Sequence, residues 1–182
     1  MDGDKVKKFL IIGNMNAITY KEIFPLIKDN KIWGGFKSFS GGMDFLAGDN
    51  YDANKCKHPK YDENGNIIIN VMGCIWFTNI ETKKRHTPLD LYKKYYNDEY
   101  PKYDNYDAIE CSKVCDIPMD YDDVIGVPIT FLNKYCPEQF EILGLTSSSK
   151  ENTYGMLKGN VTTRAMINDK KVYARILIRR KK

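Results

Sequence analysis

Two asparagines that follow a short apolar run are the first candidates for chemistry in this 182-residue chain. Residues 9–12 (FLII) are consecutive apolar side chains, as in a strand that is covered on both faces of a parallel sheet. Gly13 then suits a tight turn, and Asn14 and Asn16 fall beyond the carboxyl end of the strand, where open α/β sheets bind ligands. These asparagines are candidates for lining a ligand pocket, although the same spacing fits an ordinary strand–helix unit of a core.

A second group of candidates follows the apolar run at residues 67–77, which predicts a central strand. Trp76 lies in this run and Asn79 just after it, and the basic turn that comes next contains Lys83, Lys84 and Arg85. Lysine and arginine neutralise phosphates, whereas asparagine and aromatic rings can meet bases. The pattern therefore favours a nucleic-acid surface, and its alternative is a core strand followed by a solvated run of charge.

Carboxylates and thiols offer weaker signals for a metal or catalytic site. Residues 116–123 (DIPMDYDD) could bind Mg²⁺ or act in catalysis, but acidic loops are more often simply solvated. The five cysteines are an odd number without a disulfide-framework spacing, which indicates reduced thiols. Neither Cys56 with His58 nor Cys111 with Cys115 has the tight pair spacing of a zinc site, so no metal is expected.

The overall composition permits a nucleic-acid partner without requiring one. A net charge of +4 is only mildly basic. Thirteen tyrosines supply stacking surfaces, and those interleaved with lysine and aspartate at residues 95–107 could either line a nucleic-acid cleft or pack over a surface loop. No stretch resembles a targeting signal or a membrane span, so we expect a cytoplasmic protein that does not bind a membrane.

The elements that must position these residues indicate one domain over residues 1–182, with a loop or insertion at 36–66. Thr19 and Glu22 have capping-box spacing for a helix that follows, and Pro25 predicts a kink or a first-turn position in it. A short helix is expected at residues 89–96.

The strands expected later in the chain complete the fold class. Pro128 predicts an edge or bulged strand, residues 140–145 predict a short strand, and the alternation over residues 171–179 predicts an edge or half-exposed strand. Many short strands and few helices predict a mixed, strand-rich α/β fold.

Several of these stretches, taken in order, resemble the EcoRI-type family of adenine-specific DNA methyltransferases. They are residues 9–33, 74–86, 101–110, 125–144 and 170–180. The resemblance implies part of a class I, Rossmann-like methyltransferase with DNA-recognition elements. It further implies transfer of a methyl group from S-adenosylmethionine to the N6 amine of an adenine flipped out of duplex DNA, within a restriction-modification system.

Two of the family's features are absent from the sequence. No two prolines are adjacent, so the catalytic Asn-Pro-Pro-Phe tetrapeptide is missing, and no glycine-rich loop for the methyl donor occurs. The chain therefore resembles the C-terminal half of the family and is expected to be inactive alone. A truncated gene, a split enzyme with a separate N-terminal half, and a start codon further upstream are all compatible with this pattern.

The resemblance assigns roles only to candidates already named. No catalytic residue can be assigned; Asn14 and Asn16 are predicted to line the base or cofactor pocket. Contact with double-stranded DNA is predicted for Trp76, Asn79, Lys83, Lys84 and Arg85. The alternatives are a non-enzymatic DNA-binding module, an inactive remnant, and an unrelated small enzyme that uses the carboxylates of residues 116–123.

Overall fold

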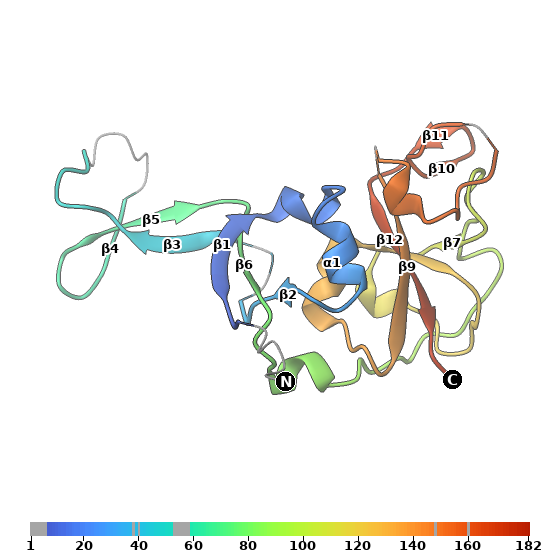
Figure 1. Ribbon diagram of the computed structural model, residues 1–182, viewed down its shortest axis with the longest axis horizontal. Coiled ribbons are helices and arrows are strands. Elements are labelled where there is room, and N and C mark those ends of the chain that lie inside the picture. Colours follow the sequence, from blue (N-terminus) through green and yellow to red (C-terminus); the bar gives the residue numbers. More distant parts are fainter. Residues whose placement is uncertain (1–6, 38, 40, 53–58, 148, 160) are drawn as a thin grey trace, which may run out of the picture.

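The computed structural model describes residues 7–37, 39, 41–52, 59–147, 149–159 and 161–182, and short strands dominate it (Figure 1). The strands are β1 (Leu10–Asn14), β2 (Trp33–Gly34), β3 (Met43–Leu46), β4 (Lys60–Tyr61), β5 (Ile67–Val71), β6 (Cys74–Thr78), β7 (Ile109–Glu110), β8 (Ile125–Pro128), β9 (Phe140–Thr146), β10 (Met166–Ile167), β11 (Lys170–Lys171) and β12 (Arg175–Arg180). The helices are α1 (Phe24–Lys28) and the 3-10 turns η1 (Met15–Thr19), η3 (Lys83–His86), η4 (Val114–Asp116), η5 (Ile129–Lys134) and η6 (Glu151–Thr153). The mixed, strand-rich α/β class is therefore confirmed.

The first sheet has the antiparallel order β1-β6-β2, which leaves β1 at its edge. Leu10, Ile11 and Ile12 are 53%, 54% and 43% exposed. The prediction of a buried central strand in a parallel sheet was therefore wrong. An apolar run records only a preference for burial, and the described part of the chain supplies no layer that covers these three side chains.

The residues predicted to end the first strand and to cap the following helix also have other roles in the structure. An added Cβ at Gly13 would lie 2.9 Å from a ring carbon of Phe77, so Gly13 admits this ring from within the strand rather than ending it. The Thr19 hydroxyl donates to the Asn16 carbonyl, and α1 begins without a side-chain cap, so the capping box was wrong. Pro25 occupies the first turn of α1, as one of its two expected positions.

A three-stranded arm, ordered β3-β5-β4, projects from the first sheet at the left of Figure 1. It contains two strands from residues 36–66, which were expected to form a loop or insertion. The predicted strand at 67–77 is divided into β5 and β6, because Gly73 turns the chain with a φ of 74°.

The second sheet, ordered β7-β8-β12-β9, holds most of the core. β12 lies in its interior with residues 175–178 buried, so the prediction of an edge or half-exposed strand was wrong. β9 confirms the short strand expected at 140–145. Pro128 ends β8, which pairs with β7 on one side and β12 on the other and is therefore not an edge strand.

The segment between the sheets is extended rather than helical. The predicted helix at 89–96 does not form, because the side-chain amide of Gln139 binds both the N–H and the carbonyl of Leu89, at 2.7 and 2.8 Å. Tyr100, Tyr103 and Tyr106 are buried, so this part of the tyrosine-rich segment packs into the fold. No helix in the described residues is both long and apolar enough to cross a membrane.

Candidate functional site

The turn after β1 presents the two candidate asparagines at the surface. The Asn14 side-chain oxygen accepts a 2.8 Å hydrogen bond from the Asn16 N–H and so caps η1. Met15, which follows Asn14, donates its N–H to the Gly73 carbonyl and so connects this turn to the start of β6. The Asn16 amide is exposed and has no hydrogen-bond partner among the described residues, so it is the better placed of the two to bind a ligand.

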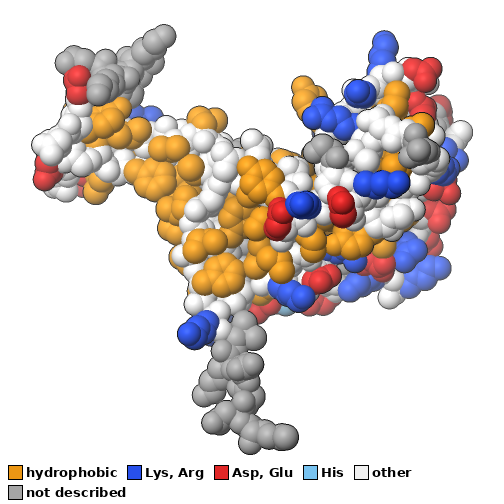
Figure 2. All heavy atoms as spheres, turned by 45° about the horizontal axis from the view of Figure 1, so that its top comes forward, with side chains coloured by type: hydrophobic (Ala, Val, Ile, Leu, Met, Phe, Trp, Pro, Cys, Tyr) orange, Lys and Arg blue, Asp and Glu red, His pale blue; other side chains and the backbone are white. Residues whose placement is uncertain are grey.

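Trp76 belongs to the outward face of the first sheet. It lies opposite Ile12 in the β1–β6 ladder, and its carbonyl accepts a 2.8 Å hydrogen bond from the Gly35 N–H. Residues that face each other in an antiparallel pair project to the same side of the sheet. In Figure 2, apolar side chains gather over the first sheet, and this apolar surface continues onto the arm.

The Asn79 side chain makes hydrogen bonds with the backbone just before β1 and is therefore not free to bind a ligand. Its side-chain oxygen accepts from the Phe9 N–H, and its amide nitrogen donates to the Lys7 carbonyl, both at 2.9 Å. These bonds continue the pairing of β1 with β6 beyond the last ladder residue. The geometry therefore gives Asn79 a positioning role in the first sheet.

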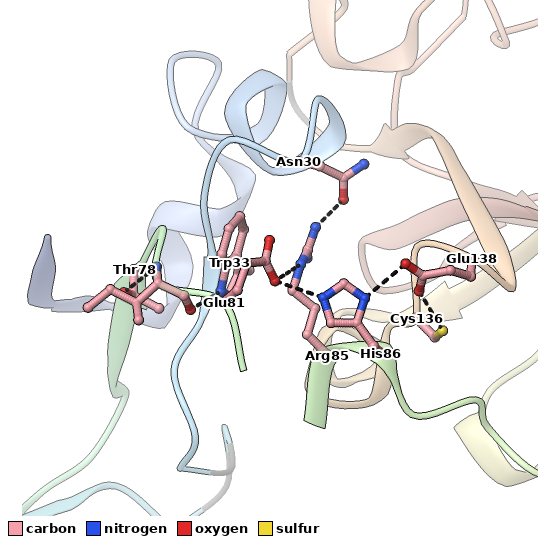
Figure 3. A network of polar contacts seen from close by, with 9 residues as sticks. Asn30, Trp33, Thr78, Glu81, Arg85, His86, Cys136 and Glu138 are labelled. Atoms are coloured by element: carbon pink, nitrogen blue, oxygen red, sulfur yellow. Dashed lines mark hydrogen bonds and ion pairs between the residues drawn. The ribbon is translucent and has the colours of Figure 1, made fainter. Parts of the chain in front are cut away.

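The basic turn, formed by η3, divides its three candidate cations between burial and exposure, and Figure 3 shows the buried one, Arg85, among its polar partners. Arg85 is buried, donates to the Asn30 side chain at 2.7 Å and lies 4.0 Å from the centroid of the Trp33 ring. Its Nε also lies 3.4 Å from Glu81 Oε2, an ion pair without hydrogen-bond geometry. Arg85 therefore connects the turn to its surroundings and does not present a free cation to solvent.

The two lysines of the turn are more accessible. Lys83 is exposed and its ammonium group has no polar partner among the described residues, whereas the Lys84 ammonium donates to the Phe36 carbonyl at 2.9 Å. Lys84 also lines a surface cleft of about 350 Å³ together with Lys134 and Tyr92. The sequence did not single out Lys134 or Tyr92, because only the tertiary fold brings η5 beside the basic turn.

A histidine clamp was also missed from the sequence. His86 lies between two carboxylates, with Nδ1 2.8 Å from Glu138 and Nε2 2.9 Å from Glu81. These contacts, that with Glu138 first, raise the pKa of His86 above its usual 6.5. The Cys136 thiol and then His86 lower the pKa of Glu138 to about 2. The clamp joins the basic turn to the segment that precedes β9.

This clamp predicts a pH dependence of folding. A raised His86 pKa stabilises the fold fully below the unfolded value of 6.5, and that contribution disappears as pH rises through the folded value. The lowered Glu138 pKa contributes above about 4.5 and is lost as pH falls toward 2. Urea unfolding is expected to show a midpoint that falls between pH 6 and 8.5 in the wild type and falls less in His86→Gln. Equal falls in both would contradict the clamp.

The acidic segment makes contacts that support the fold. Asp120 accepts the Tyr95 N–H at 2.7 Å, and Asp122 accepts from Arg180 at 2.8 Å. Within the described ranges, no three His, Cys, Asp or Glu side chains gather in an arrangement that could hold a metal ion. Cys56 and His58 lie outside the described residues.

Comparisons with known proteins identify the family. The family model described as "Adenine-specific methyltransferase EcoRI" matches residues 4–181. The Type II methyltransferase M.EcoRI of Escherichia coli is 46% identical over 178 residues, which cover 97% of this chain and 51% of that protein. The Type II methyltransferases M.MgeORF184P of Mycoplasma genitalium and M.MpnI of Mycoplasma pneumoniae are each 34% identical, over 96% of this chain and 57% of theirs.

The chain thus spans little more than half the length of these curated relatives. No solved structure matches it significantly. The family match nevertheless runs through both sheets and through every candidate residue named above. The chain therefore belongs to the EcoRI family of adenine-specific methyltransferases.

Proposed function

We propose that this chain is part of an adenine-specific DNA methyltransferase of a restriction-modification system. The observation that carries the proposal is the family match, which extends over residues 4–181. The reaction would transfer a methyl group from S-adenosylmethionine to the N6 amine of an adenine flipped out of duplex DNA. A cytoplasmic location, where DNA and the methyl donor meet, follows from this role.

The exposed edge of β1 supports a role that is shared with another polypeptide segment. β1 pairs with β6 on one side, and among the described strands none pairs with its other side. A free edge that carries Leu10, Ile11 and Ile12 is suited to receive a further strand. We assign this position to the N-terminal half of the methyltransferase, as a separate chain or a preceding segment, which would bring the Asn-Pro-Pro-Phe tetrapeptide. A Rossmann-like sheet would then form across the junction.

Asn16 fits one wall of a pocket at this junction. Its free amide can exchange hydrogen bonds with the polar groups of S-adenosylmethionine or of a flipped base, and Asn14 holds the turn that presents it. Ile12, which lies shortly before these asparagines in the sequence, offers an exposed apolar side chain that a heterocyclic ring could contact. S-adenosylmethionine supplies the methyl group when bound, and the chain contributes binding and orientation.

Duplex DNA would be held by the exposed part of the basic turn. Lys83 and Lys84 are suited to phosphate contact, with Lys134 on the same cleft as Lys84. Trp76 offers an aromatic surface on the outward face of the sheet. Arg85 and Asn79 support these side chains from within, because their polar groups already bind protein atoms.

The lysines give a direct test of DNA contact. Lys83→Ala is expected to weaken binding to all duplex sequences about equally and to reduce the slope of log K against log salt by about 1. Lys113 is an exposed lysine immediately before η4 and serves as the matched control. Lys113→Ala is expected to leave the slope unchanged. Fluorescence anisotropy over a salt series measures both. An unchanged slope for Lys83→Ala would remove this residue from the interface.

Reconstitution tests the enzyme itself. The chain is mixed with the part of M.EcoRI that lies outside the match, duplex DNA and radiolabelled S-adenosylmethionine, and N6-methyladenine is quantified. Label is expected only when both polypeptides are present. DNA binding without label would instead support a non-enzymatic DNA-binding module, which the missing tetrapeptide favours, and absence of both activities would indicate an inactive remnant.

A further inference from the structure

The β10–β11 hairpin is a second rigid surface that lies apart from the basic turn along the chain. Met166 pairs with Lys171 and Ile167 with Lys170, and the two turn residues between the strands have φ values of 50° and 60°. Positive φ at both positions is the signature of a type I′ turn. The Val172 N–H donates to the Ala165 carbonyl, so the same register continues beyond the two short strands.

Side chains of the preceding tyrosine-rich segment anchor this hairpin. The buried Asn105 amide donates to the carbonyls of Thr162 and Arg164 and accepts from the Met166 N–H. The Asp104 carboxylate accepts both N–H groups of the turn, at 3.3 and 2.9 Å. Because its backbone is held along its length, the hairpin would lose little conformational entropy when it binds a partner.

The two faces of the hairpin differ in chemistry. Ala165 is buried and its neighbour Val172 packs against the core cluster that contains Leu177. Alternation places Lys171 and Tyr173 on the face opposite to Val172, and Arg164 lies in the bend just before Ala165. All three are exposed, Tyr173 to 84%, and neither Arg164 nor Lys171 has an ion-pair partner among the described residues. We call Arg164, Lys171 and Tyr173 the outer hairpin face.

We propose that the outer hairpin face contacts the sugar–phosphate backbone of duplex DNA. This inference rests on the proposed function, since it adds a second contact region to the same DNA complex. A guanidinium and an ammonium neutralise phosphates, and a tyrosine hydroxyl donates to phosphate oxygens. A two-stranded β-ribbon also has a shape that DNA grooves accommodate. Figure 1 places the hairpin at the opposite end from the arm, and Figure 2 shows Lys and Arg side chains protruding there.

The hairpin contains its own matched control. Lys170 precedes Lys171 on the same strand and carries the same charge, but alternation directs it to the other face, opposite Ile167. Arg164→Ala combined with Lys171→Ala is expected to weaken duplex binding by about tenfold or more and to lower the salt slope by about 2. Tyr173→Phe is expected to weaken binding without changing the slope, whereas Lys170→Ala leaves both unchanged.

Anisotropy with one short duplex over a salt series measures these effects, and circular dichroism confirms that each variant is folded. Equal loss in Lys170→Ala and Lys171→Ala would overturn the proposal, because it would show a general charge effect without a preferred face. An unchanged double variant, with Lys83→Ala still weakening binding, would overturn the hairpin contact and leave the proposed function standing. Wild-type chain that binds no duplex at low salt would instead count against the proposed DNA role itself.

Discussion

Arg175→Ala is expected to lower the free energy of unfolding by about 3–5 kcal/mol, measured by urea denaturation. Arg175 in β12 and Glu110 in β7 form a buried ion pair whose side chains are only 11% and 9% exposed. The guanidinium makes three contacts with the carboxylate between 2.7 and 3.1 Å, and the Tyr103 hydroxyl donates to the same group. Removing the arginine leaves a buried carboxylate without its counter-ion.

A surface pair provides the control for this prediction. Arg179 in the same strand binds Glu141 at 3.0 Å, but both side chains are more than one-third exposed. Arg179→Ala is therefore expected to cost no more than about 1 kcal/mol. Similar losses for the two variants would show that burial does not govern the Glu110–Arg175 pair. The double variant Glu110→Leu with Arg175→Met should recover much of the loss, because no unpaired charge remains.

Lysine at both Leu10 and Ile12 is expected to abolish methyl transfer in the reconstitution while the chain itself stays folded. Leu10 is 53% exposed and Ile12 is 43% exposed, so their replacement should change the free energy of unfolding by about 0.5 kcal/mol or less. In the assembled enzyme the same positions would lie under the N-terminal half, where burying an unpaired ammonium costs several kcal/mol. Sedimentation velocity of the mixed polypeptides and the methylation assay report the two effects separately.

Tyr92→Lys is the matched control for the edge variants. Tyr92 is 65% exposed and lines the cleft beside the basic turn. It is far from β1 in the sequence and does not belong to the first sheet. It is expected to leave assembly of the two polypeptides intact. Full methylation by the Leu10 and Ile12 double variant would contradict the proposed docking of an N-terminal half on β1 and would leave family membership unaffected.

The local sequence predicted several elements correctly because their signals are short-range. Pro25 at the first turn of α1 and the strand β9 both follow from residue type and spacing within a few positions. Residues 67–77 were expected to form one strand, and the structure divides them at Gly73, because a glycine permits a turn without specifying how far the chain turns.

Burial was the least predictable property. Residues 9–12 appeared from their composition to be a core strand, yet three of them line an exposed edge. β12 was expected to be an edge or half-exposed strand and lies buried inside its sheet. An alternating or continuous pattern describes one strand, whereas burial depends on which other strands and layers cover it. Those partners come from distant parts of the chain or from outside it.

The sequence by itself determined family membership and the mixed, strand-rich class, because both depend on residue identity along the chain. Only the tertiary structure decided which candidate side chains remain available. It committed Arg85 and Asn79 to internal contacts, left Asn16 and Lys83 exposed, and brought Lys134 beside Lys84. The physical reason is that a hydrogen-bonding group is free to bind a ligand only when folding has not already given it a partner, and that depends on residues far apart in sequence.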